Sequence, residues 1–431
     1  MKFHHTLFPI CLIASLISCQ TGTQEENAGQ TITLTNNADI NLTDKGISVQ
    51  RGQLNIEENK YPSIRDAAGN LVPAQLDDVD GDGDWDELFL VTDFSAGESK
   101  SVTLEWVDNP HEFTIRTSVR FGKRESADEP VQPRTEDTLP ADGLPRSVGY
   151  QPYQTDGPSW ENDKVGFRHY FDGRNSKDVF GKKTAEMSPE DVGISATGAV
   201  EDNYHVMEDW GRDILAVGNS IGLGGIALLI NDQPARIGVT VEDAVNNVES
   251  STFRILSEGP VRSIMTFAYS NWETNGRSYS NIEERVSIMP GMYAYKNEVR
   301  VQGMQGDEHL AIGLVNIHND NPLREITEFD DWMVLMTHDE QTYDKEWYLG
   351  MALILPKSEY IEWVEAPKSG VLSNTYLAKM RTANDRPIAY YSVAAWELSD
   401  EKFRDADNFE QYVIDLVAHL EADVSIEINK Y

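Results

Sequence analysis

The segment 204–220 holds the densest group of side chains that could carry out acid–base chemistry. His205 can exchange a proton near neutral pH, and Glu208 or Asp209 could orient its imidazole. Trp210 offers a flat ring on which a sugar could stack. The charged groups could instead form salt bridges within a long loop, but acidic and aromatic loops on β scaffolds are commonly functional. This segment is therefore the first candidate site.

A second candidate is the segment 160–171, whose side chains alternate in character. As a β-strand it places apolar side chains and His169 on one face, and we expect this histidine in the core or at its rim. The other face carries Lys164, Gly166, Arg168 and Tyr170. Two cations and a phenol around a glycine suit an acidic sugar, which needs a guanidinium for its carboxylate and room for its ring. The alternative interpretation is an exposed, polar sheet face.

The segment 78–89 has the spacing of a loop that wraps a hard cation. Carboxylates stand at alternate positions and glycine stands at the sixth, as in calcium-binding loops. The carboxylates are those of Asp78, Asp80, Asp82, Asp84 and Asp86. The twelfth position, where such loops usually have glutamate, is Phe89. A structural calcium site and an acidic turn that closes without metal both fit this pattern.

The overall charge excludes some partners. The chain has 72 acidic and 36 basic residues, for a formal charge of -36. Nucleic acid and anionic membrane surfaces are poor partners, because both require clustered lysine and arginine. The chain also lacks a serine nucleophile elbow, a zinc motif and a dinucleotide-binding fingerprint. An anionic substrate would therefore require a local cluster of basic side chains at its binding site.

The first nineteen residues resemble a secretory signal of the lipoprotein type. A short basic start is followed by an apolar run and by Leu-Ile-Ser before Cys19. The apolar run is shorter than the roughly 20 residues of a membrane span. We therefore expect residues 1–19 to be the signal with its lipidated cysteine, and residues 20–30 to be a tether. This predicts a lipid-anchored protein of the cell envelope whose only membrane contact is its anchor.

Short alternating segments separated by turn residues predict antiparallel strands along most of the chain. Residues 31–119 are expected to form an N-terminal β-sandwich. Five prolines in 120–154 predict a linker or long loop. Residues 155–431 are expected to form a large two-sheet supersandwich, with a helix only at 400–420. The fold class is therefore all-β with one C-terminal helix.

Four motifs together resemble one family of lipoproteins from polysaccharide-utilisation loci, long labelled a domain of unknown function. They are the acidic Asp-Gly loop, WENDKVGFRHY from Trp160, YHVMEDWGRDILAVGNSIGLGG from Tyr204, and EGPVR from Glu258. The branch of this family that acts on ulvan includes oligosaccharide dehydratases. The resemblance implies a mutarotase-like or lyase-like supersandwich. It also implies removal of water from a non-reducing-end uronate, which leaves a 4,5-unsaturated sugar.

That reaction gives roles to the candidate residues. Arg168 or Arg212 would offset the uronate carboxylate, because its charge opposes removal of the neighbouring C5 proton. His205 and Tyr170 would serve as the base and the acid, in either order, and no cofactor is required. The residues expected to bind the acidic oligosaccharide are Trp160, Glu161, Asn162, Lys164, Lys182, Lys183, Glu208, Asp209, Trp210 and His318.

Two other functions fit the same sequence. A polysaccharide lyase would remove the same proton but expel a sugar, and would need an open groove with several subsites. A non-catalytic glycan-binding lipoprotein would use the aromatic surface without turnover.

Overall fold

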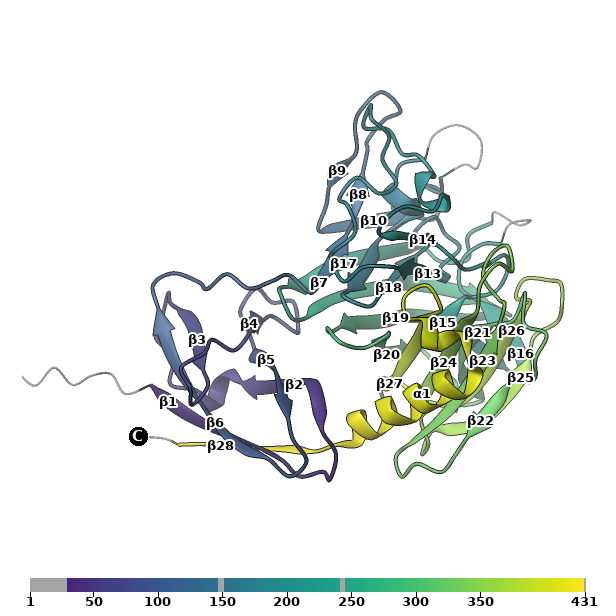
Figure 1. Cartoon of the computed structure of the whole chain (residues 1–431). Coiled ribbons are helices and arrows are strands. Elements are labelled where there is room, and N and C mark those ends of the chain that lie inside the picture. Colours follow the sequence, from purple (N-terminus) through teal and green to yellow (C-terminus); the bar gives the residue numbers. More distant parts are fainter. Residues whose placement is uncertain (1–28, 146–150, 241–244, 430–431) are drawn as a thin grey trace, which may run out of the picture.

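The computed structural model describes residues 29–145, 151–240 and 245–429. Strands dominate these residues, and one α-helix lies near the C-terminal end (Figure 1). This confirms the expected all-β class with a C-terminal helix. The lipoprotein signal with Cys19 and most of the tether lie outside the described residues.

A small sandwich of two sheets forms the N-terminal part. One sheet has the order β28-β1-β6-β3 and the other β2-β5-β4. Alternate side chains of both sheets meet in a separate apolar core that includes Ile32, Leu34 and Leu88. The strands are β1 (Gln30–Asn36), β2 (Leu42–Gln50), β3 (Tyr61–Arg65), β4 (Ala74–Asp77), β5 (Glu87–Phe94), β6 (Ser99–Val107) and β28 (Val424–Ile428). A 3-10 turn, η1 (Arg51–Gln53), follows β2.

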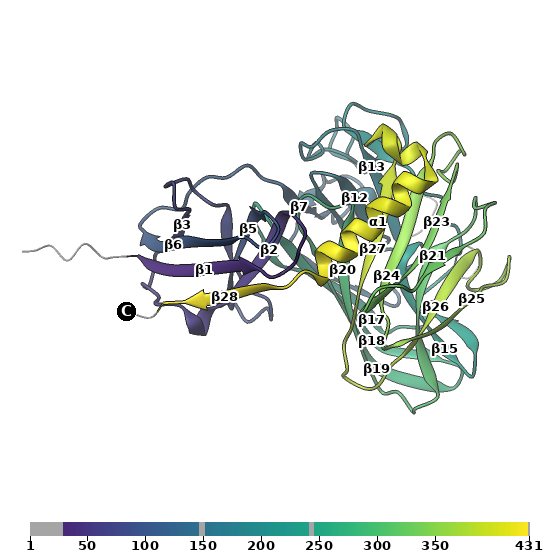
Figure 2. The ribbon, with the colours of Figure 1, turned by 60° about the horizontal axis from the view of Figure 1, so that its bottom comes forward.

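The strand β28 changes the expected domain division. It leaves the supersandwich after the helix and pairs antiparallel with β1, with Ile32 opposite Ile428 (Figure 2). The N-terminal sandwich therefore contains a strand that follows the supersandwich and the helix in the chain. Sequence periodicity missed this partnership because it shows that a segment is a strand but not which strand it joins.

The prediction that residues 120–154 form a linker or long loop is wrong for much of that segment, which contains short strands. The segment contains β10 (Glu136–Pro140), which forms the edge of the largest sheet, where a terminal proline is tolerated. It also contains the short pair β8 (Gly122–Lys123) and β9 (Gln132–Pro133). Its prolines confine these strands to edges and ends rather than abolishing them.

The larger part is built around a nine-stranded antiparallel sheet with the order β10-β17-β18-β19-β20-β27-β24-β23-β22. Its remaining strands are β17 (Ser250–Glu258), β18 (Ser263–Thr274), β19 (Arg277–Ile288), β20 (Ala294–Gln302), β22 (Arg324–Ile326), β23 (Trp332–Asp339), β24 (Leu349–Pro356) and β27 (Ile388–Trp396). The helix α1 (Ala406–Glu421) contacts β23 and β24, and η4 (Glu401–Arg404) precedes it. None of the helices in the described ranges is long and apolar enough to span a membrane.

Two five-stranded sheets pack on the nine-stranded sheet, and one apolar core runs through all three. The first has the order β14-β13-β12-β11-β7, with β7 (Thr117–Arg120), β11 (Ser159–Asn162), β12 (Val165–His169), β13 (Lys177–Lys182) and β14 (Gly211–Asp213). The second has the order β16-β15-β21-β26-β25, with β15 (Leu223–Ile230), β16 (Gln233–Arg236), β21 (Glu308–Val315), β25 (Tyr360–Glu365) and β26 (Thr375–Arg381). This is the expected supersandwich. The 3-10 turns η2 (Gln154–Asp156) and η3 (Asn203–His205) lie in its loops.

Candidate functional site

The guanidinium of Arg168 is the centre of a buried polar network on the first five-stranded sheet. It donates to Oδ2 of Asp213 at 2.7 Å and to the hydroxyl of Tyr170 at 2.6 Å, and it also bonds Asp178. The carbonyl oxygen of Thr155 accepts a further bond at 3.3 Å. The side chain of Arg168 is fully buried. Its charge is therefore balanced inside the protein and is not available to a substrate carboxylate, which corrects that expectation.

Strand register places these groups together. Arg168 on β12 lies opposite Asp178 on β13, and Phe180 on β13 lies opposite Asp213 on β14. Because residues two apart in a strand share a face, all four side chains lie on one face of the sheet. The neighbouring phenol of Tyr170 donates at 2.7 Å to Asp178. The sequence thus correctly predicted that Arg168 and Tyr170 share a face.

A glycine at the start of β14 allows this close pairing. Gly211 has φ 142°, and a Cβ there would lie 1.8 Å from the carbonyl oxygen of Gly181. Any side chain would therefore push β14 away from β13 and displace Asp213.

His205 lies at the exposed end of the network. Its side chain is 47% exposed, and its Nδ1 lies 3.6 Å from Oδ2 of Asp213. The preceding Tyr204 is buried against Phe180 and fixes the turn η3 beneath the imidazole. His205, Tyr170 and Arg168, three of the four expected catalytic residues, therefore belong to one connected network. The geometry leaves Nε2 of His205 as the ring atom that does not face Asp213.

Burial and neighbouring charge shift the protonation of this network. Burial, with the carboxylate of Asp178, raises the pKa of Asp213 to about 8 although Arg168 opposes the shift. Partial burial and the charge of Arg168 lower the pKa of His205 below its usual value. Burial raises the pKa of Tyr170 well above that of a free phenol. At neutral pH the imidazole is therefore uncharged and able to accept a proton.

Two further arginines lie at the rim of the site. Arg212 donates from Nε to the carbonyl oxygen of Asp213, and its terminal nitrogens lie 3.8 Å and 3.6 Å from Asp344 and Glu346. Those two carboxylates are exposed, so their attraction is weakened by water. Arg212 is thus better placed than Arg168 to meet an anionic ligand.

Arg174 lies over the ring of Tyr170. Its guanidinium carbon lies 3.7 Å from the centroid of the Tyr170 ring, and it pairs with Asp172 at 2.5 Å. No pattern in the sequence pointed to this arginine, because it lies in a turn and reaches the site only through the fold.

The loop between β23 and β24 adds aromatic side chains that the sequence did not identify. Tyr343 is 54% exposed, and its ring centroid lies 6.4 Å from that of His205. Trp347 lies 5.9 Å from the guanidinium of Arg212. The loop is held against β14 by the backbone bond from Tyr343 N to Ile214 O. Its composition, with two aromatic and two acidic residues in 342–347, was the available signal.

Comparison with known proteins places the whole fold in one family. The family model described as a domain of unknown function, DUF4861, matches residues 34–426. The chain belongs to the DUF4861 family. A DUF4861 match of this extent runs from β1 to β28, so it includes both sandwiches.

One relative and two solved structures are similar to this DUF4861 chain. Uncharacterized protein P7 of Formosa agariphila is 24% identical over 450 residues, which cover 99% of this chain and 100% of the relative. An alpha-mannosidase from Enterococcus faecalis V583 aligns with TM-score 0.48 and 11% identity over 93% of this chain and 46% of its own. A glycosyl hydrolase family 38 protein from Enterococcus faecalis aligns with TM-score 0.46 and 12% identity, over 93% and 47%. The chain spans about half the length of these two structures.

Several expected binding residues are internal in this DUF4861 protein. Trp160 lies in the core, 5.3 Å from the ring of Tyr295, and cannot stack on a sugar. Asn162 is buried and donates to the carbonyl oxygens of Met289 and Met292. Both residues are on β11, every residue of which is buried. The expected roles of Trp160 and Asn162 are therefore wrong.

Glu161 and Lys182 form a second buried pair. Their charged groups bond one another, and Arg120 lies 3.1 Å from Oε1 of Glu161. Ser188 donates its backbone N–H to the same carboxylate at 3.1 Å. The cavity beside them holds only about 10 Å³, which is too small for a sugar. These charges anchor the loop after β13 and are not substrate ligands.

The remaining expected ligands lie near the surface or cover the network. Trp210 is buried against Phe180, so it shields the network and does not face solvent. The other side chains are exposed or partly exposed, namely Lys164, Lys183, Glu208, Asp209 and His318. His169 is buried in the core, 4.3 Å from the ring of Phe267, as expected.

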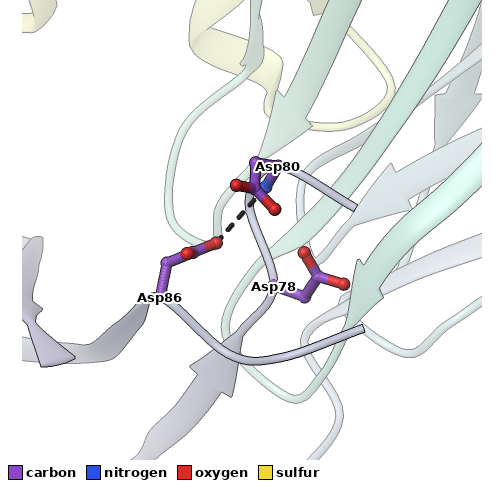
Figure 3. A group of neighbouring side chains, drawn as sticks. All are labelled: Asp78, Asp80 and Asp86. Atoms are coloured by element: carbon purple, nitrogen blue, oxygen red, sulfur yellow. Dashed lines mark hydrogen bonds between the residues drawn. The ribbon is translucent and has the colours of Figure 1, made fainter. Parts of the chain in front are cut away.

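The acidic loop lies far along the chain from this network, in the N-terminal sandwich. Oxygens of Asp78, Asp80 and Asp86 lie within 4.8 Å of one another (Figure 3). Asp86 also accepts the backbone N–H of Asp80 at 3.3 Å, and Asp78 accepts that of Gly83 at 2.9 Å. The oxygens could hold calcium, since three carboxylates converge, and they also close the turn themselves. Asp82 and Asp84 are exposed and lie outside the converging group.

Proposed function

We propose that this protein is a carbon–oxygen lyase that eliminates water from the non-reducing-end uronate of ulvan-type oligosaccharides. The observation that carries the proposal is the half-exposed imidazole of His205, set on the buried Asp213–Arg168–Tyr170 network. Elimination next to a carboxylate needs a neutral base that is held in place, and this arrangement supplies one. The resemblance of the WENDKVGFRHY and YHVMEDWGRD motifs to the ulvan branch supports the substrate class.

His205 is the base in this proposal. Its Nε2 takes the C5 proton, and the electron pair of that C–H bond forms the C4–C5 double bond as the C4–O bond breaks. Asp213 faces Nδ1, and its ionised form, which predominates above about pH 8, stabilises the resulting imidazolium. The lowered pKa of His205 keeps the base unprotonated at neutral pH.

The leaving hydroxyl needs a proton, because hydroxide is a poor leaving group. The hydroxyl of Tyr170 already bonds Arg168 and Asp178 inside the network, so it positions those groups. Tyr343 is the exposed phenol beside His205 and takes the role of acid in the proposal. Arg212 then offsets the carboxylate charge that grows as the C5 proton leaves.

Incubation with uronate-terminated ulvan oligosaccharides tests the proposal. The expected result is rising absorbance at the unsaturated-uronate band and a mass loss of one water without chain shortening. Shorter unsaturated products would indicate a polysaccharide lyase, and binding without any product would indicate a glycan-binding protein. Either result would overturn the dehydratase assignment.

Lipid anchorage at the cell envelope is proposed from Cys19 and its preceding apolar run. Labelled fatty acid should be incorporated into the wild-type protein and not into Cys19→Ala. Equal labelling of both proteins would contradict the anchor.

A further inference from the structure

The second five-stranded sheet carries an aromatic pair at its edge, formed by the exposed Trp363 and the partly buried Tyr376. Trp363 on the edge strand β25 is 37% exposed and lies 5.5 Å from Tyr376 on β26, ring centroid to ring centroid, at 82°. Register places Glu365 opposite Tyr376, so the two rings are diagonal neighbours on one face. Exposed aromatic rings on a rigid sheet are suited to the apolar face of a pyranose ring.

A chain of contacts joins this pair to the site at His205. The hydroxyl of Tyr376 donates at 3.2 Å to Oδ1 of Asn319. The next residue, Asp320, accepts at 3.0 Å from Lys345, which is two residues after Tyr343. Tyr343 in turn neighbours His205. Two loops therefore connect the aromatic pair directly to the rim of the proposed active site.

Three lysines lie beside the aromatic pair and offset part of the negative charge there. One of them, Lys379, is shared by Glu362 and Asp232. Each of three carboxylates near the pair has a lysine partner: Asp320 with Lys345 at 3.0 Å, Glu365 with Lys368 at 3.0 Å and Glu362 with Lys379 at 3.3 Å. The whole chain has a charge of -36, which repels an anionic ligand over most of a surface. The three lysines weaken that repulsion in this region, and the partly exposed His318 immediately precedes Asn319 in the chain.

We propose that this region is a remote subsite, in which Trp363 and Tyr376 hold internal sugars of the oligosaccharide whose terminal uronate lies at His205. The inference rests on the proposed function for the position of the terminal sugar. The subsite takes uncharged or anionic pyranose units and gives the enzyme a preference for longer chains. Trp363 is the residue that contributes most, because it is the more exposed ring.

Calorimetric titration of the His205→Ala protein tests the subsite without consuming the ligand. The probes are a uronate-terminated disaccharide and the corresponding hexasaccharide. Adding Trp363→Ala should weaken hexasaccharide binding about tenfold more than disaccharide binding, as expected for a tryptophan anchor. Trp363→Phe should restore part of the difference. Ile40→Ala, which removes a comparably exposed apolar side chain from the N-terminal sandwich, should change neither affinity.

The outcomes separate the two proposals. Equal weakening of both ligands, or unchanged hexasaccharide binding in Trp363→Ala, would overturn the subsite even if wild-type protein dehydrates its substrate. Selective loss of hexasaccharide binding would support the subsite even if wild-type protein produces no unsaturated sugar. In that case the dehydratase proposal alone would fail.

Discussion

Nδ1 of His205 lies 3.6 Å from Oδ2 of Asp213, and the same carboxylate oxygen accepts a 2.7 Å hydrogen bond from Arg168. One oxygen thus links a half-exposed imidazole to a fully buried cation. The link explains how a surface histidine can keep a fixed orientation, and it gives the network several measurable properties.

Replacement of His205 by alanine should remove the base. We expect the dehydration rate to fall at least about a hundredfold. The melting temperature should change little, because the side chain is half exposed and contributes little to the core. Absorbance assays and thermal unfolding measure the two effects. Near-normal turnover in a folded His205→Ala protein would exclude this residue as the base.

Replacement of Tyr170 by phenylalanine tests a positioning role. The change removes the hydroxyl that bonds Arg168 and Asp178 and leaves buried polar groups without that partner. We expect a loss of about 1–3 kcal/mol in the free energy of unfolding and a smaller rate loss than for His205→Ala. Denaturant unfolding and turnover assays measure both. A large rate loss with unchanged stability would instead make Tyr170 the acid, and Tyr343→Phe is the matched comparison.

The raised pKa of Asp213 predicts a pH-dependent stability. Its pKa is about 8 in the folded protein and has the ordinary value of 3.8 when unfolded. Between pH 3.8 and about 8 the folded protein holds a proton on Asp213 that the unfolded protein has released. The contribution of Asp213 to the free energy of unfolding is therefore greatest at the acid end of this window and is lost as pH rises through about 8. Thermal unfolding from pH 5 to 9 should show this decline, and Asp213→Asn should flatten it. An equally steep decline in Asp213→Asn would assign the effect to another group.

Trp160 should matter for stability and not for substrate affinity. It is buried against Phe167 and Tyr295, so Trp160→Ala should cost about 3–5 kcal/mol through lost burial and a cavity. Trp160→Phe retains an aromatic ring and should cost less. A Trp160→Phe protein that folds normally but has a much higher KM would contradict a purely structural role for Trp160.

The acidic loop should respond to calcium. Millimolar calcium should raise the melting temperature of the N-terminal sandwich by about 4 °C or more, because a ligand that binds only the folded state stabilises it. A chelator or Asp78→Asn should abolish the increase, while Asp66→Asn, in another acidic turn of the same sandwich, should retain it. Identical melting curves with calcium and with chelator would support a turn that closes without metal.

Alternation along the sequence predicted which side chains of β12 share a face, and it placed His169 on the apolar face. It could not show which faces meet solvent, because every residue of β11, β12 and β13 is buried. Trp160 was misassigned for this reason. When both faces of a strand are buried, the alternation of side chains shows which residues share a face. It does not show whether either face is exposed to solvent.

Local sequence patterns also could not identify residues that reach the site from loops distant in the sequence. Tyr343 is adjacent to His205 only because the loop after β23 bonds β14. The pairing of β1 with β28 is equally non-local. Spatial proximity between such segments depends on the topology of the sheets, and a single sequence does not report it.

The pairing of β1 with β28 also has a consequence for biosynthesis. During translation β1 is made before the strands of the supersandwich, whereas its outer neighbour β28 is made after them. One edge of the N-terminal sheet therefore stays open while the supersandwich is being made, and an open edge can pair with other chains. Synthesis of β28 closes this edge, so the N-terminal sandwich is completed only after the strands of the supersandwich have been made.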